Sequence, residues 1–101
     1  MSPSSNDDPI ALEFSREQAW VAHVAVHEAG REAVEAGDTD PSERRLADAI
    51  EGDRSVQSAD LSVLRDALVA YLGDAPLRDR APGRAALHTV NEALGVSTAD
   101  A

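Results

Sequence analysis

Residues 15–36 read SREQAWVAHVAVHEAGREAVEA and predict the longest helix of the chain. Ser15 and Gln18 have the spacing of a capping box, in which each side chain bonds the backbone of the other residue. Gly37 is suited to the position just after a helix and stands at the other end. We therefore expect a helix over about residues 16–36.

Three shorter helices are expected further along the chain. Asp40, Pro41 and Glu43 supply an N-cap, a proline at the first helical position and a capping-box partner. Further on, leucines at three- and four-residue spacing form one apolar stripe. The expected helices cover about residues 41–51, 59–72 and 82–94.

The short connections between these helices favour one fold class. Residues 10–14 alternate between apolar and other side chains, but this run is too short to predict a sheet. Residues 74–81 contain a proline and several charges and are expected to form an exposed loop. We predict an all-α fold, a small antiparallel bundle of four helices. The domain should span residues 10–95, between a disordered lead-in at 1–9 and a frayed tail at 96–101.

The charged residues are strongly unbalanced. Aspartate and glutamate total 19, the nine basic residues are all arginine, and the net charge is −10 for 101 residues. Such a chain repels itself at low ionic strength, but molar salt shortens the Debye length to about 3 Å. We therefore expect a halophilic protein with an acidic surface, although a GC-rich genome would also favour arginine and alanine. Nucleic acid and anionic membranes are not expected as partners, because both attract clustered cations.

Several chemistries are excluded by absent residue types and motifs. Cysteine is missing, which removes disulfides and cysteine-based zinc sites. The sequence has neither a phosphate-binding glycine loop nor a Gly-x-Ser-x-Gly motif. No apolar run approaches the roughly 20 residues of a membrane span, and residues 1–8 lack the features of a signal peptide. We expect a cytoplasmic protein that has no cofactor and is not an enzyme.

The helix at 16–36 has two apolar sides on a helical wheel. The wider side is expected to face the core and holds Trp20, Val24, His27 and Val34. The other side is a seam of small residues at 4–3–4 spacing, Ala22, Val26, Ala29 and Ala33. Two interpretations remain open. Either this is the central helix and buries both sides within its own domain, or the seam is the interface of a twofold homodimer.

His23 and His27 lie four residues apart, so both rings project from one helical face. This spacing lets two imidazoles share a metal ion. The comparison with a zinc-protease helix fails, because Arg31 stands where the second histidine of that motif would be. Two ligands do not complete a site. We therefore predict no metal, with His23 and His27 as the candidate ligands if one binds.

Arg78, Arg80 and Arg84 form the one local cluster of positive charge in the sequence. Together with a helix N-terminus they could receive an anion or an acidic partner surface. The alternative is that they pair within the chain, with Asp74 and Asp79.

Two motifs resemble those of a known group of proteins. Residues 14–21, FSREQAWV, precede His23, and residues 64–68, LRDAL, precede Tyr71. The pattern resembles small uncharacterised helical proteins of haloarchaea, which open with a Ser/Thr-Arg-Glu-Glu/Gln-x-Trp helix and later carry Leu-Arg-Asp-x-Leu-x-x-Tyr. The resemblance covers roughly residues 14–72. It implies a haloarchaeal origin and a helical fold but no activity, and it leaves the last helix as a candidate addition.

Three functions follow from these observations. The first is a non-catalytic helical interaction module, an adaptor or regulator that binds itself through the first helix and an unidentified protein partner. The second is a transcription-associated regulator with a helix-turn-helix-like element, in which the last helix would read DNA through Arg84. The third is a metal-binding bundle that uses His23 and His27.

Overall fold

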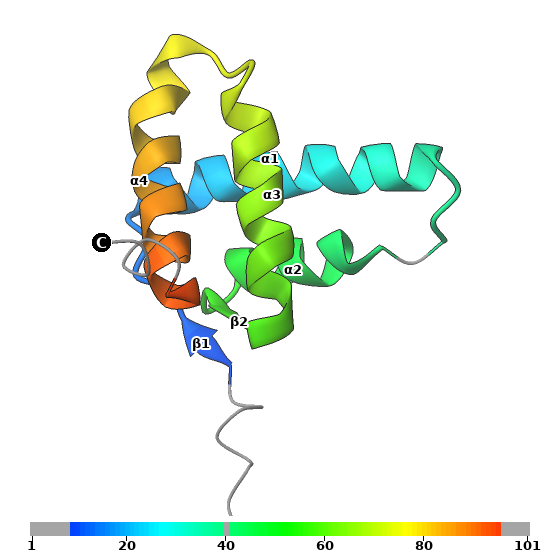
Figure 1. Ribbon diagram of the computed structural model, residues 1–101, viewed down its shortest axis with the longest axis horizontal. Helices are drawn as coiled ribbons and strands as arrows, with labels where there is room; N and C mark the ends of the chain where they lie inside the picture. Colours follow the sequence, from blue (N-terminus) through cyan, green and yellow to red (C-terminus); the bar gives the residue numbers. More distant parts are fainter. Residues whose placement is uncertain (1–8, 40, 96–101) are drawn as a thin grey trace, which may run out of the picture.

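Two helical hairpins lie across one another in a computed structural model, which describes residues 9–39 and 41–95 (Figure 1). The elements are β1 (Ile10–Ala11), α1 (Arg16–Glu35), α2 (Ser42–Glu51), β2 (Ser55–Val56), a 3-10 turn η2 (Ser58–Asp60), α3 (Leu61–Leu72) and α4 (Leu77–Leu94). The predicted all-α fold with four helices is confirmed for this part of the chain. The strands add one small antiparallel ladder, in which Ile10 pairs with Val56 and Ala11 with Ser55.

Helix α1 is the central element. It packs against α2, α3 and α4, whereas α2 and α4 share no extensive contact with each other. In Figure 1, α2 runs back beside α1, and the antiparallel α3 and α4 cross the α1/α2 pair. The first of the two interpretations is therefore right about the central position of α1, but α1 does not bury both of its apolar sides, because Trp20 is 62% exposed.

The start of α1 forms as its sequence predicts. The Ser15 hydroxyl accepts the Gln18 backbone N–H at 3.1 Å, and the Gln18 side-chain oxygen accepts the Ser15 N–H at 3.0 Å. This complete capping box satisfies two of the N–H groups that a helix start leaves without partners. At the other end Gly37 has φ of 109°, a conformation that favours glycine.

One predicted helix start is wrong, and another differs from the structure by one residue. Helix α2 begins at Ser42, with Pro41 as its N-cap and no side-chain capping bond; the predicted cap, Asp40, lies outside the described residues. Helix α4 begins at Leu77 rather than near residue 82, so residues 77–81 are helical and not a loop. Pro76 has φ of −58° and directly precedes the helix as its N-cap.

Close packing explains why α4 continues through Pro82. The proline removes one backbone hydrogen-bond donor, but the next residue, Gly83, is buried against α1 and α3. A Cβ added at Gly83 would lie 2.6 Å from Leu72 Cδ2 and 3.3 Å from Val21 Cγ1. The absence of a side chain there lets three helices approach one another at a single point.

The core is built on the small side of α1. Ala22, Val26, Ala86 and Val90 have no exposed surface, so α4 is an integral part of the core rather than an addition. The expectation that the wider side faces inward is wrong, since Trp20 is 62% exposed. No helix of the described residues is long and apolar enough to cross a membrane.

A charged pair closes the start of α3. Asp60 is 4% exposed and accepts two hydrogen bonds from Arg45, at 2.8 Å to Nη2 and 3.1 Å to Nε. The guanidinium of Arg45 thus joins α2 to the turn before α3. Such bidentate pairs are stronger than neutral hydrogen bonds.

Candidate functional site

The outward side of α1 carries a mainly apolar stripe that the rest of the described chain covers only in part. We call it the outer stripe; its residues are Trp20, Val24, His27, Arg31 and Val34. Trp20 and Val34 are 62% and 47% exposed, and Val24 is half-buried. Successive members are separated by 4, 3, 4 and 3 residues, which is the spacing of a helix–helix seam.

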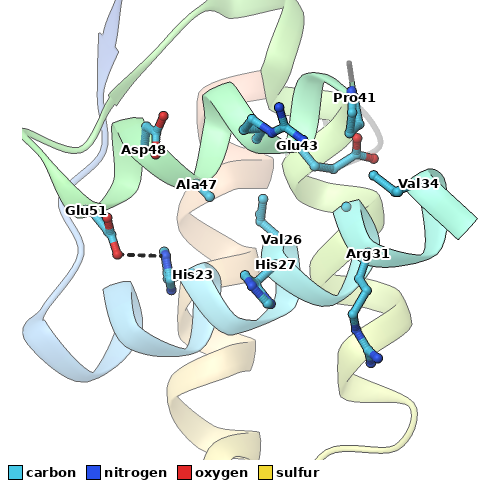
Figure 2. A pocket seen from close by; sticks show the side chains of 12 residues that line it. His23, Val26, His27, Arg31, Val34, Pro41, Glu43, Ala47, Asp48 and Glu51 are labelled. Atoms are coloured by element: carbon cyan, nitrogen blue, oxygen red, sulfur yellow. Dashed lines mark ion pairs between the residues drawn. The ribbon is translucent and has the colours of Figure 1, made fainter. Parts of the chain in front are cut away.

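A groove of about 590 Å³ separates α1 from α2 beside this stripe (Figure 2). Val26, Gly30 and Ala47 contribute apolar lining. At one end Val34 points toward Pro41 and Glu43, as Figure 2 shows. Helix packing is close here, because a Cβ added at Gly30 would lie 3.1 Å from Glu43 Cβ.

The other end of the groove is marked by an ion pair and a row of rings. His23 Nε2 lies 3.0 Å from Glu51 Oε2, joining α1 to α2. The Trp20 and His23 rings are stacked with centroids 6.4 Å apart, and the His23 and His27 rings lie 6.3 Å apart. Three consecutive rings thus run along the exposed side of α1.

The predicted metal ligands do not form a complete site. His23 is oriented toward Glu51, and its neighbour His27 is exposed. The third histidine, His88, pairs with Glu92 on α4 at 3.1 Å. Among the residues that the structure describes, no group of three or more His, Cys, Asp and Glu side chains is arranged to hold a metal ion.

Arg31 is the one permanent charge within the outer stripe, and it has a close partner. Its Nη2 lies 2.6 Å from Glu28 Oε1, one turn earlier. This hydrogen bond and the accompanying charge attraction lower the pKa of Glu28 and raise the pKa of Arg31. Figure 2 shows Arg31 pointing away from α2, although Arg31 still belongs to the charged lining of the groove together with Glu43, Arg44, Asp48 and Glu51.

The small-residue seam is not a surface. Ala22 and Val26 have no exposed area, Ala29 packs against the core, and Ala33 is half-buried. The proposed interface of Ala22, Val26, Ala29 and Ala33 is therefore corrected: at least its first two residues contact the chain's own helices and are not available to a second molecule. The sequence showed both sides of α1 as apolar, and the missing signal was which one the hairpin of α3 and α4 would cover.

The arginine cluster falls within the first turns of α4 and is largely engaged inside the chain. Arg78 Nε lies 4.0 Å from Asp79 Oδ1, and Arg80 Nε donates to the Ala75 carbonyl at 3.3 Å. Arg84 is exposed one turn further on. Asp79 also accepts the Tyr71 hydroxyl at 2.7 Å. This hydrogen bond is the main reason that the pKa of Tyr71 is raised to about 12, with burial second.

Comparison with known proteins places the chain in a class and a family. The fold and the outer stripe define a small all-α domain with a partly covered helix face. The chain belongs to DUF7853, a family of unknown function that matches residues 12–91. The match agrees with the expectation of an uncharacterised family, and its range includes residues 14–72 and most of α4. No curated protein and no solved structure matches the chain.

Proposed function

We propose that this chain is a non-catalytic interaction module, an adaptor or regulator, that binds a protein partner through the outer stripe and the adjoining groove. The observation that carries the proposal is the exposure of Trp20, the single tryptophan of the chain, at 62%. Burying a large apolar side chain is worth about 1.5–3 kcal/mol, and most of that gain is forgone at this position. Contiguous exposed apolar side chains typically mark interaction sites.

The composition of the groove is compatible with binding. Among the described residues, its lining combines apolar Val26, Gly30 and Ala47 with charged side chains. His23 is engaged by a carboxylate that is itself 64% exposed, which leaves that pair open to water. Apolar lining flanked by charged side chains is the usual anatomy of a protein-binding surface.

We further propose that the module works in concentrated salt in the cytoplasm of a halophile. A net charge of −10 with arginine as the only strongly basic residue supports this assignment, because salt screens the repulsion among the acids. Under these conditions apolar contacts carry association, since surface ion pairs weaken as salt rises. The outer stripe is suited to such an environment.

Affinity capture tests the proposal with matched variants. The tagged full chain would be incubated with extract of its source organism in about 2–3 M KCl, conditions of strong screening. Trp20→Glu places a charge on the stripe, while Leu77→Glu places the same charge at a 79% exposed apolar residue of α4. We expect the wild type and Leu77→Glu to retain the same binding partner and Trp20→Glu to lose it. A partner retained equally by all three proteins would rule out the outer stripe.

A further inference from the structure

We infer that the partner on the outer stripe is a second copy of this chain, docked antiparallel about a twofold axis that passes by His27. The inference rests on the proposed function, because it names the occupant of the same surface. It differs from the dimer that the sequence suggests, which used the opposite, buried side of α1.

The two ends of the stripe lie at equal distances from His27. Trp20 and Val34 each lie seven residues from it, about 10 Å along the helix axis in either direction. Val24 and Arg31 lie between, three residues before and four residues after. In an antiparallel pair with His27 at its centre, Trp20 of each copy meets Val34 of the other. The 4–3–4–3 spacing is the one that lets two helices keep a seam in contact.

Each copy also carries a projection and a hollow on the same side of the molecule. The projection is the Trp20 ring, which is not part of the groove lining. The hollow is the groove, bounded near Val34 by Pro41 (Figure 2). At about 590 Å³ it lies within the range of roughly 300–1,000 Å³ typical of small-molecule pockets, and an indole ring fits such a volume. In an antiparallel dimer, the Trp20 ring of each copy therefore lies toward the groove of the other copy.

Charge favours a second copy on this side of a strongly acidic chain. The outer stripe contains no carboxylate, and its one permanent charge, Arg31, is held by Glu28. Self-association elsewhere would bring together surfaces rich in aspartate and glutamate, which repel. The stripe itself thus brings no carboxylate to the contact. The groove beside it is lined by Glu43, Asp48 and Glu51 as well as by Arg31 and Arg44, and molar salt screens the repulsion among these acids.

The size of the contact predicts a weak dimer. Stable specific interfaces bury about 800 Å² on each partner, and one face of a 20-residue helix lies at the low end of that scale. Association should consequently depend on protein concentration in the micromolar range and above.

Sedimentation of the purified full chain in about 2–3 M KCl, over a hundredfold range of concentration, tests the inference. Because Trp20 is the only tryptophan, its emission reports burial at the same time. We expect a monomer–dimer equilibrium, with emission moving to shorter wavelength as the dimer forms. Trp20→Glu and Val34→Arg should each weaken association at least tenfold, and Leu77→Glu should not. Circular dichroism establishes that every variant retains its helix content.

Mixing the two variants tests the antiparallel register. A mixed dimer contains one native contact of Trp20 with Val34 and one contact between the introduced carboxylate and the introduced guanidinium. We therefore expect an equimolar mixture of Trp20→Glu and Val34→Arg to associate more tightly than either variant alone. A mixture no tighter than its components, or a dimer indifferent to Trp20→Glu, would overturn the proposed arrangement.

The outcome also separates this inference from the proposed function. A wild-type chain that stays monomeric at every concentration overturns the second copy as occupant. If extract capture still depends on Trp20 in that case, the interaction module stands with a different partner. If neither experiment depends on Trp20, both proposals fail.

Discussion

The two sides of α1 distribute their side chains against expectation: the small residues are buried and the large ones are exposed. Ala22 and Ala25 are at most 1% exposed, whereas Trp20 is 62% exposed. Apolar content alone would have placed the tryptophan inside. The difference shows that in this domain burial follows from how closely other helices can approach.

Close approach explains which side of α1 packs against α3 and α4. The antiparallel α3 and α4 lie across α1, and a crossing pair comes closest where the intervening side chains are smallest (Figure 1). Alanines on α1 and Gly83 on α4 meet this requirement. The bulkier outer side is not crossed by α3 and α4, and Trp20 on it stays 62% exposed.

Enlarging a side chain on the buried, small-residue side of α1, which we call the inner side, should produce the largest loss of stability. Ala22→Leu inserts three carbon atoms at a position with no exposed surface, and overpacking of this kind costs about 1–3 kcal/mol. Because α1 contacts three helices at once, we expect the upper end of that range, measured as the free energy of unfolding in urea at constant salt. Ala70→Leu makes the same change at an exposed position of α3 and should stay within about 0.5 kcal/mol. Equal losses in both variants would contradict the assignment of the inner side.

The sequence predicted the helices well because local rules determine them. The Ser15 capping box was visible in the sequence and is present, and four helices with their glycine ends were expected from periodicity. The start of α4 was missed because two prolines, Pro76 and Pro82, both fit a helix start. Local sequence rules do not distinguish between these two prolines as the start of α4. The close contact at Gly83 determines which of them begins the helix.

The candidate site could not be predicted from the sequence for a related reason. Periodicity identified two apolar sides of α1 but carries no information about where α3 and α4 pack. The groove depends on α2 lying beside α1, and the Arg45–Asp60 pair joins residues 15 positions apart. Tertiary packing alone decides these features, so the residues of the site were recognised while their roles as surface or core were reversed.

A polar contact between α3 and α4 should contribute an intermediate, pH-dependent amount to the free energy of unfolding. Tyr71 on α3 donates to Asp79 on α4, and its pKa is raised to about 12 from an ordinary value near 10. The protonated phenol is thus favoured by folding, so its contribution is complete below about pH 10 and lost as pH rises toward 12. Because Tyr71 is partly exposed, we expect Tyr71→Phe to cost only about 1 kcal/mol at pH 8. That cost should shrink above pH 11.

Titration of the single tyrosine provides the measurement and its control. The absorbance of tyrosinate should rise with a midpoint well above 10 in the wild type. In Asp79→Asn the residue can still accept a hydrogen bond, but the repelling charge is gone, so the midpoint should fall. An unchanged midpoint would show that Asp79 does not raise the pKa of Tyr71.

Shortening Trp20 on the outer side of α1 should produce the smallest change in stability, although Trp20 is the largest side chain of the chain. Trp→Ala in a protein core costs about 3–5 kcal/mol, but Trp20 is mostly exposed and alanine is the better helix former. We therefore expect Trp20→Ala to change the unfolding free energy by less than about 1 kcal/mol, measured at protein concentrations low enough to keep the chain monomeric. A core-sized loss would mean that Trp20 holds the fold together. A small loss combined with weakened association would assign the residue to binding, and the contrast with Ala22→Leu would show that the two sides of one helix serve folding and recognition separately.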